Sequence, residues 1–318
     1  MAKTWIEVAL NGPWGRALQP RIPVTVDEIV AEGLACARAG ASIVHFHAYN
    51  EATGKQEDHW ETYARVIEGL RAGADVIAYP TIPLAGSGLS SHEPAAARER
   101  FRHIDELGRR GLIEWAVVDP GTVNFTRFEL LGEGDAGFVY LNPGEHIREG
   151  LRLAREHGLR PSYAIYEPGF TRLGAAFARV EKLSVSPVYR FMFSDEFAWG
   201  FPPQPYALDA HLTLLDWSAP GAPWMIAGLG VDITGLIGVA AARGGHVRVG
   251  LEDACFGTSA SNLELVERAA RRVLASGGEP ATPGEVRTAL VRVDATARAS
   301  DRAREGCSVP AFGGADRV

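Results

Sequence analysis

Short runs of apolar, mostly β-branched residues alternate along the chain with longer stretches in which apolar residues recur every three or four positions. Short apolar runs are typical of buried strands, whereas the longer period indicates helices. The expected strands cover residues 4–11, 42–48, 75–81, 113–119, 161–167, 188–194, 223–229 and 245–252. The expected helices begin with one opened by Thr25 and continue near 58–72, 92–110, 143–157, 170–182, 204–217, 232–243 and 261–276.

Eight repeats of a strand followed by a helix favour a (β/α)8 TIM barrel over a doubly wound sheet, because eight parallel strands can close and leave no edge. The first strand is followed by Asn11-Gly-Pro-Trp14 rather than by G-x-G-x-x-G, so a dinucleotide site is not indicated. Barrels of this kind often form one domain of about 250 residues. We expect a barrel domain over residues 1–290 and a C-terminal extension over 291–318.

Composition narrows the class of partner and the setting. The 318 residues carry a net charge of −7 and no basic run interleaved with aromatic residues, so a small molecule is expected rather than nucleic acid. Neither an apolar leader nor a membrane-spanning run of about 18 residues is visible. The three cysteines, Cys36, Cys255 and Cys307, are widely spaced, which is typical of a cytoplasmic protein without disulfides.

The segment His45-Phe-His47 ends the second expected strand, and Glu252-Asp253 ends the eighth. Side chains two apart on a strand point to the same face, so the two histidines form a metal clamp. A carboxylate from the eighth strand, Glu252 or Asp253, would complete a site of the kind that holds catalytic zinc. An isolated histidine pair is more often structural, and the distant carboxylates are what favour a metal.

Active sites of TIM barrels lie at the carboxyl ends of the strands. Other polar or aromatic residues fall at these ends and are therefore candidate substrate contacts, namely Asn11, Trp14, Thr81, Thr122 and Asn124. Thr122, and Arg248 on the eighth strand, also have structural interpretations. Thr122 is also suited to closing a turn after Gly121, and Arg248 is also suited to a core ion pair with Glu252.

Four segments together resemble the β-keto acid cleavage enzymes, a family that includes the 3-keto-5-aminohexanoate cleavage enzyme of lysine fermentation. These segments are His45-Phe-His47, Asp119-Pro-Gly-Thr-Val-Asn-Phe125, Gly244-Gly-His-Val-Arg-Val-Gly-Leu-Glu-Asp253 and Ala281-Thr-Pro-x-Glu-x-Arg287. The resemblance runs from about residue 4 to about residue 290. It implies a zinc-dependent barrel, usually a homotetramer, that converts a β-keto acid and acetyl-CoA into acetoacetate and a new acyl-CoA.

The resemblance also implies roles for individual residues. His45, His47 and Glu252 would bind the metal, Arg248 and Asp253 would act on the reacting carbons, and Thr122 would hold substrate. Thr81 stands where the family has a hydroxyl residue.

The chemistry of the reaction supports these roles independently. Cleavage of a carbon–carbon bond beside a ketone needs a base and a positive charge for the enolate, which Asp253 and zinc would supply. On an extended strand roughly 16 Å, at about 3.3 Å per residue, would separate the Cα atoms of Arg248 and Asp253. The arginine side chain must then climb toward the rim, and Gly250 leaves that path open.

The chain departs from the pattern of family members that bind an ammonium group. Trp14 stands where such members carry an acidic residue, and the fifth-strand segment Pro161-Ser-Tyr-Ala-Ile-Tyr166 has no acid. If Trp14 and Tyr163 or Tyr166 line the far end of the pocket, that end is aromatic and uncharged. We therefore expect a neutral or apolar β-keto acid, with a quaternary ammonium group as the exception that aromatic faces would accept.

Two other function classes are weighed against this interpretation. A metal-dependent hydrolase on the same barrel also uses an H-x-H pair, but it would place the pair on the first strand and add histidines after the fifth and sixth. A non-catalytic ligand-binding barrel would not need Arg248, Glu252 and Asp253 together. His246, at the start of its strand, is interpreted as structural. Six histidines receive no role, namely His59, His92, His103, His146, His157 and His211.

Overall fold

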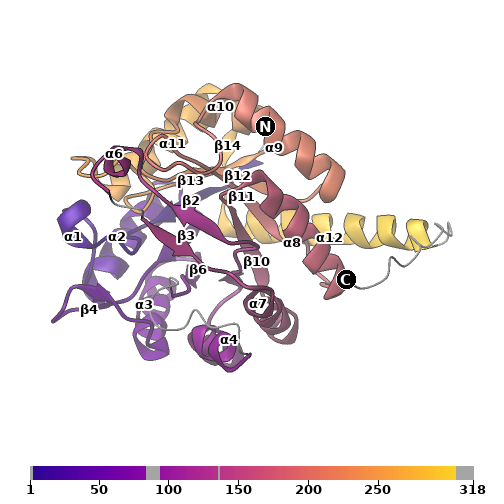
Figure 1. Cartoon of the computed structure of the whole chain (residues 1–318), viewed down its shortest axis with the longest axis horizontal. Coiled ribbons are helices and arrows are strands. Elements are labelled where there is room, and N and C mark those ends of the chain that lie inside the picture. Colours follow the sequence, from indigo (N-terminus) through magenta and orange to yellow (C-terminus); the bar gives the residue numbers. More distant parts are fainter. Residues whose placement is uncertain (1–2, 84–93, 135–136, 306–318) are drawn as a thin grey trace.

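The computed structural model describes residues 3–83, 94–134 and 137–305 of the chain. Its centre is a parallel eight-stranded sheet whose hydrogen-bonded order is β6-β3-β2-β13-β12-β11-β10-β7 (Figure 1). The strands are β2 (Ile6–Ala9), β3 (Ile43–Phe46), β6 (Ile77–Pro80), β7 (Trp115–Val117), β10 (Arg160–Ile165), β11 (Val188–Phe193), β12 (Trp224–Gly228) and β13 (His246–Val249). All eight expected strands are confirmed, although each hydrogen-bonded core is shorter than its apolar run.

The sheet curves into a nearly closed TIM barrel, as predicted. Every neighbouring pair in the order above is parallel, and β2, the first barrel strand, pairs with both β3 and β13. The remaining seam lies between β6 and β7, where the described residues show no hydrogen-bonded ladder. Closure brings the ends of β3 and β13 to either side of β2, which is how segments two hundred residues apart become neighbours.

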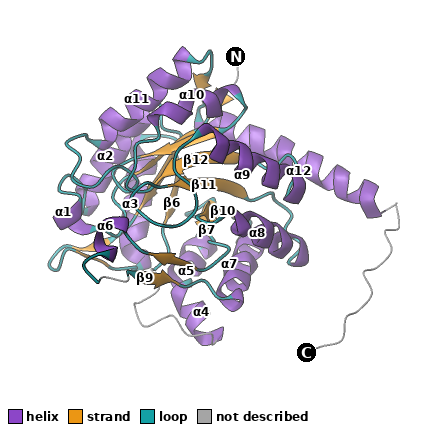
Figure 2. Ribbon diagram, turned by 45° about the horizontal axis from the view of Figure 1, so that its top comes forward, coloured by secondary structure: helices purple, strands orange, loops and turns teal. Residues whose placement is uncertain are grey.

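Helices surround the strands (Figure 2). They are α2 (Val26–Arg38), α3 (Trp60–Gly73), α4 (Pro94–Arg100), α5 (Arg102–Arg109), α7 (Gly144–His157), α8 (Pro168–Val180), α9 (Pro205–Ser218), α10 (Thr234–Ala242) and α11 (Asn262–Ala275). The expected cap of the first long helix is confirmed, because Thr25 and Glu28 form a reciprocal capping box.

The helix expected over 92–110 is in fact two helices, α4 and α5. Phe101, at the break, has φ −99° and ψ 8°, and its ring is buried. A Cβ on Gly150 of α7 would lie 3.0 Å from the Phe101 ring, so the two elements are in close contact there. Burial of the aromatic ring against α7 therefore accompanies the interruption. Residues 92 and 93, including His92, lie outside the described residues.

Several elements of two to four residues had no detectable sequence period. They are β1 (Lys3–Thr4), β4 (Tyr49–Asn50), β5 (Lys55–Gln56), β8 (Val123–Phe125), β9 (Phe138–Tyr140), β14 (Glu279–Pro280), α1 (Gly15–Leu18) and α6 (Phe128–Leu131). The antiparallel pairs β4–β5 and β8–β9 follow the barrel strands β3 and β7, and so belong to the loops at the carboxyl end.

Helix α12 (Pro283–Glu305) runs through residue 290, so the boundary expected there falls inside a helix. Asp294 beyond that point is buried and accepts from Arg160 of β10, with Nη2 and Oδ2 2.7 Å apart. The helix then projects past the barrel (Figure 1). Residues 306–318, with Cys307, lie outside the described part, and the division at 290 stays a prediction. Within the described ranges no helix is long and apolar enough to cross a membrane.

Candidate metal centre

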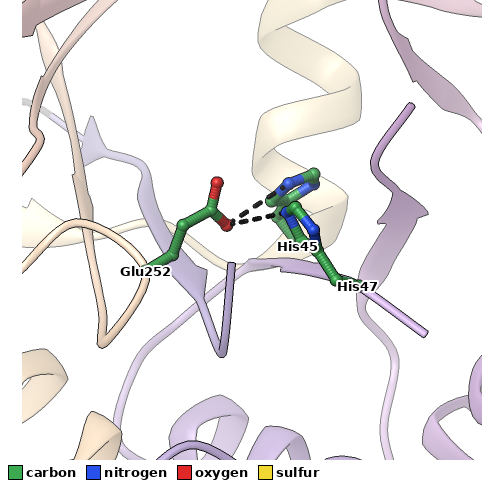
Figure 3. A group of neighbouring side chains, drawn as sticks. All are labelled: His45, His47 and Glu252. Atoms are coloured by element: carbon green, nitrogen blue, oxygen red, sulfur yellow. Dashed lines mark ion pairs between the residues drawn. The ribbon is translucent and has the colours of Figure 1, made fainter. Parts of the chain in front are cut away.

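Three potential metal ligands converge at the carboxyl end of the barrel. His45 and His47 come from the end of β3, and Glu252 comes from the turn after β13 (Figure 3). Each histidine Nε2 lies 3.5 Å from Oε2 of Glu252, and one ligand atom from each residue lies within 4.8 Å of the others. All three side chains are buried. Of the two carboxylates that the sequence left open, Glu252 is the one that faces the histidines.

The turn after β13 decides which carboxylate points where. The strand ends at Val249, and the amides of Asp253 and Ala254 donate to the carbonyl of Gly250 at 3.1 and 2.9 Å. The expected extended path from Arg248 to Asp253 is therefore wrong, because the chain folds back. Gly250 has φ +141°, and a Cβ there would lie 2.1 Å from the carbonyl oxygen of Ala9. Glycine is required by this close backbone approach, not by the path of the arginine side chain.

The segment Asn11-Gly-Pro-Trp14 supports the ligands. Asn11 is fully buried, and its amide donates to the carbonyl of His47 at 3.0 Å and accepts from the amide of His47 at 2.8 Å. Gly12 has φ +64°, and a Cβ there would lie 2.6 Å from Cγ of Glu252. The indole of Trp14 donates to the carbonyl of Glu252 at 2.9 Å. Asn11, expected to contact substrate, thus has its amide committed to the backbone of a candidate ligand.

The hydrogen bonds around the three side chains suit a cation. Nδ1 of His47 lies 2.8 Å from Oε1 of Gln56, whose amide donates to both carboxylate oxygens of Asp58 at 3.0 Å. This partner fixes the ring with Nε2 facing Glu252. Among the described residues, neither Nε2 of His47 nor Oε2 of Glu252 has a hydrogen-bond partner. Buried polar atoms are rarely left unpaired, so the donor set fits a metal ion such as zinc.

Electrostatics keep His45 and Glu252 in the forms that bind a metal. Burial holds the pKa of His45 well below its usual value, although Glu252 opposes the shift, so the ring is neutral. Burial alone would raise the pKa of Glu252, but Arg248 and the two histidines bring it well below its usual range. Neutral imidazoles and an ionised carboxylate are the required donors.

Arg248 pairs both with Asp253, its expected partner at the reacting carbons, and with Glu252, its expected partner in a core ion pair. Its Nε and Nη2 donate to the two oxygens of Asp253 at 2.8 and 2.9 Å, which is a bidentate contact. The same guanidinium lies 2.8 Å from Oε1 of Glu252 and 3.2 Å from Oε1 of Glu7. Burial raises the pKa of Asp253, and Arg248 acts in the opposite direction.

A cavity beside the histidines is lined by aromatic, aliphatic and charged side chains. Trp14 and Thr81 line it as expected, and so does Tyr166. Tyr163 does not, because its ring packs under Gly174 of α8 and its hydroxyl donates to the Gly174 carbonyl at 3.3 Å. The odd and even residues of β10 face opposite sides of the barrel wall, so the alternative with Tyr163 is wrong.

Four sequence candidates are not part of this lining, namely Asn11, Thr122, Asn124 and Asp253. Thr122 and Asn124 are exposed at the β8–β9 hairpin and are not part of the lining. The hydroxyl of Thr122 accepts from the amide of Asn142 at 2.9 Å, a contact to the far end of the hairpin rather than one that closes a turn after Gly121. His246 is structural as expected, stacked on Trp5 with ring centroids 3.6 Å apart. A substrate role for Thr122 and Asn124 stays a prediction.

Sequence reasoning missed charged groups inside the barrel. Glu7 of β2 and Arg190 of β11 are buried, and Tyr79 of β6 donates to Glu7 at 2.7 Å. Asp119, quoted earlier only as part of a segment, lines the cavity together with Arg190. The sequence signal that could have identified these residues is a single charged residue within an apolar strand, as in the Val-Tyr-Arg-Phe-Met-Phe run of 188–193.

Solved structures share the barrel. The apo structure of ObcA superposes with a TM-score of 0.66 and 17% sequence identity over 85% of this chain, and the match spans 65% of ObcA. The homocysteine methyltransferase MmuM from Escherichia coli gives a TM-score of 0.51, with 11% identity over 86% of this chain and 96% of that enzyme. At these identities the likeness shows the fold alone.

Curated relatives are more informative. The 3-keto-5-aminohexanoate cleavage enzyme of Fusobacterium nucleatum is 30% identical over 85% of this chain and 91% of its own length. The 3-dehydrocarnitine:acetyl-CoA trimethylamine transferase of Rhizobium meliloti is 29% identical over 85% and 89%. The 3-oxoadipate:acetyl-CoA acetyltransferase of Cupriavidus necator is 27% identical over 78% and 79%. Because the model of the beta-keto acid cleavage enzyme family also matches residues 3–291, this chain belongs to that family and is an enzyme.

Proposed function

We propose that the enzyme converts a β-keto acid and acetyl-CoA into acetoacetate and a new acyl-CoA. C2 of the β-keto acid joins the acetyl carbonyl carbon as the acetyl C–S bond to CoA breaks. The bond between C2 and C3 then breaks, and the freed sulfur of CoA takes the released acyl group. The observation that carries the proposal is the meeting of His45, His47 and Glu252 with the Arg248–Asp253 pair. Curated relatives named as acetyl-CoA transferases support the co-substrate.

The residues divide the chemistry between them. Asp253 takes the proton from C2 of the β-keto acid and later returns one to acetoacetate. Arg248 holds Asp253 through two hydrogen bonds and keeps its carboxylate oriented. His45, His47 and Glu252 would hold zinc, which when bound polarises the ketone oxygen and stabilises negative charge there. A barrel filled by side chains below these groups limits the access of water.

The aromatic side chains of the cavity favour binding of an uncharged or apolar acyl chain. Phe125 lies at the centre of an aromatic cluster, with ring centroids 5.1 Å from both Phe138 and Tyr166. Trp14 lines the same cavity. An apolar chain gains roughly 25 cal/mol per Å² buried there, whereas a primary ammonium group would lose water at a cost of a few kcal/mol. The Asp119 carboxylate in the lining already accepts from Tyr140 and Ala164. Thr81 lies on the lining as a candidate contact for the polar end.

Three finer expectations belong to the same proposal. Zinc is the expected metal because two histidines and one carboxylate leave coordination positions open. A homotetramer and a cytoplasmic location follow from the family resemblance and from the cysteine content. Native mass spectrometry of the purified protein tests both the subunit number and the metal content.

An assay of acetyl-CoA consumption with a panel of β-keto acids tests the reaction. The expected products are acetoacetate and the matching acyl-CoA in equal amounts, from acids whose acyl chain carries no charge. Hydrolysis without acetyl-CoA would favour the hydrolase alternative, and binding without turnover would favour a ligand-binding barrel.

A further inference from the structure

A second arginine, Arg190, lines the same cavity as the two histidines. It lies in the middle of β11, paired in register with Ala164 of β10 and Met225 of β12. Its side chain is only 3% exposed. A buried guanidinium normally has hydrogen-bonded carboxylates around it, because an unpaired buried charge is costly.

The contacts of Arg190 leave donors unused. Its Nε has no hydrogen-bond partner among residues 3–83, 94–134 and 137–305. The carboxylate that approaches it is that of Asp119, with Nη2 and Oδ1 4.0 Å apart, which is too long for a hydrogen bond. Both Asp119 oxygens already accept elsewhere, from the hydroxyl of Tyr140 at 2.6 Å and from the amide of Ala164 at 2.9 Å.

Arg248, the other arginine in the lining, already has close carboxylate partners. It contacts Asp253, Glu252 and Glu7, all at 3.2 Å or less. Releasing it to a substrate carboxylate would leave buried carboxylates without a partner, which is strongly unfavourable. Among the described lining residues, Arg190 is therefore the guanidinium that can bind an anion through an unused Nε donor, with only the 4.0 Å contact to Asp119 affected.

We propose that Arg190 binds the carboxylate of the β-keto acid, an inference that rests on the proposed function. Every β-keto acid carries this carboxylate one carbon away from its ketone, whatever its acyl chain. With the ketone directed toward His45, His47 and Glu252, the carboxylate lies in the same cavity as Arg190. A forked guanidinium can orient the carboxylate through two hydrogen bonds and so present C2 to Asp253.

Binding to the zinc-loaded protein tests the proposal without turnover. Isothermal titration compares acetoacetate with acetoacetamide, a neutral molecule of nearly the same shape. The preference of the wild type for acetoacetate is expected to fall at least about tenfold in Arg190→Gln, because a charged hydrogen bond is lost. Arg190→Lys keeps the charge without the fork and should retain an intermediate preference, and it also serves as the second variant if the glutamine protein does not fold.

Arg160→Gln is the matched control, because Arg160 is also a buried arginine of the barrel but pairs with Asp294 of α12. Its ligand preference should equal that of the wild type. An unchanged preference in both Arg190 variants, with zinc content and fold intact, would overturn the proposal.

Turnover of two substrates shows which substrate carboxylate Arg190 binds, the one beside C2 that every β-keto acid has or the distal one that only 3-oxoadipate has. Arg190→Gln should reduce kcat/KM for 3-oxohexanoate, and any lower kcat/KM that the wild type shows with 3-oxoadipate should fall by the same factor. A loss confined to 3-oxoadipate would overturn the proposal, because Arg190 would then bind the distal carboxylate. An Arg190-dependent preference for acetoacetate in a protein that does not consume acetyl-CoA would support this inference while refuting the transferase.

Discussion

The indole Nε1 of Trp14 donates a 2.9 Å hydrogen bond to the carbonyl of Glu252, so one residue both lines the cavity and holds the backbone of a candidate metal ligand. Gly12, just before it, allows the side chain of Glu252 to cross the segment. Residues 12–14 therefore affect both the lining of the cavity and the position of a candidate metal ligand.

Trp14→Glu should change substrate preference. The wild type is expected to favour a neutral β-keto acid over 3-keto-5-aminohexanoate by at least about tenfold in kcat/KM, or about 1.4 kcal/mol. A carboxylate at position 14 supplies the missing counter-charge and should reduce or reverse that ratio. Trp14→Phe, which loses the hydrogen bond but stays aromatic, is the control and should keep the neutral preference. A wild type that prefers the amine contradicts the proposed pocket.

His47→Ala should abolish stoichiometric zinc, because a ligand has been removed from a site with two histidines and one carboxylate. Elemental analysis after gel filtration measures this directly. His59→Ala provides the comparison, since the His59 side chain is 63% exposed and lies outside the cluster. Equal zinc in the two variants would exclude the proposed ligand set.

Gln56→Leu should weaken zinc binding about 10- to 100-fold without removing a ligand. The amide of Gln56 connects Nδ1 of His47 to Asp58, and such outer contacts orient a histidine ligand. Competition with a chelator of known affinity gives the dissociation constant. Lys55→Leu, at an exposed neighbouring position of β5, should leave it unchanged. If the two variants bind zinc equally, the ring of His47 is oriented by something else.

Asp253→Asn should lose at least about a hundredfold in kcat while it keeps its metal, because a base rather than a ligand is replaced. Steady-state kinetics and zinc analysis of the same sample measure both properties. Asp209→Asn, an exposed aspartate on α9, controls for loss of charge. Near-full activity of Asp253→Asn would assign proton transfer to another residue.

His211→Leu should make stability less sensitive to acid. Burial lowers the pKa of His211 from 6.5 to about 3, and neither ring nitrogen has a partner in the described part of the chain. The unfolded chain therefore binds a proton below pH 6.5 that the folded chain does not. Stability is fully present above pH 6.5 and is lost as the pH falls toward 3, by at most about 1.4 kcal/mol per pH unit from this residue.

Urea unfolding between pH 7 and pH 4 measures that slope. The slope should be smaller in His211→Leu than in the wild type, and His59→Leu, at an exposed position, should not change it. Parallel slopes for all three proteins would show that other groups control acid unfolding.

The order of elements and part of the site could be predicted from local patterns. Strands and long helices have periods that a short window reveals, and the capping box of Thr25 and Glu28 lies within four residues. His45 and His47 share a strand face because they are two residues apart. The short rim elements had no period, and the break at Phe101 is accompanied by contact with a helix that a local window does not contain.

Barrel closure decided the rest. Glu7, Arg190 and Arg248 come from three strands, and their distances depend on register and on which face of each strand turns inward. The chain after Gly250 forms a turn rather than an extended strand, and this turn directs Glu252 instead of Asp253 toward the histidines. The sequence by itself determined the alternation of strands and helices and the residue types available for chemistry, because these follow from local spacing. Only the tertiary structure decided which charges are paired and which donors of Arg190 remain unused, because pairing depends on distances between residues far apart in the chain.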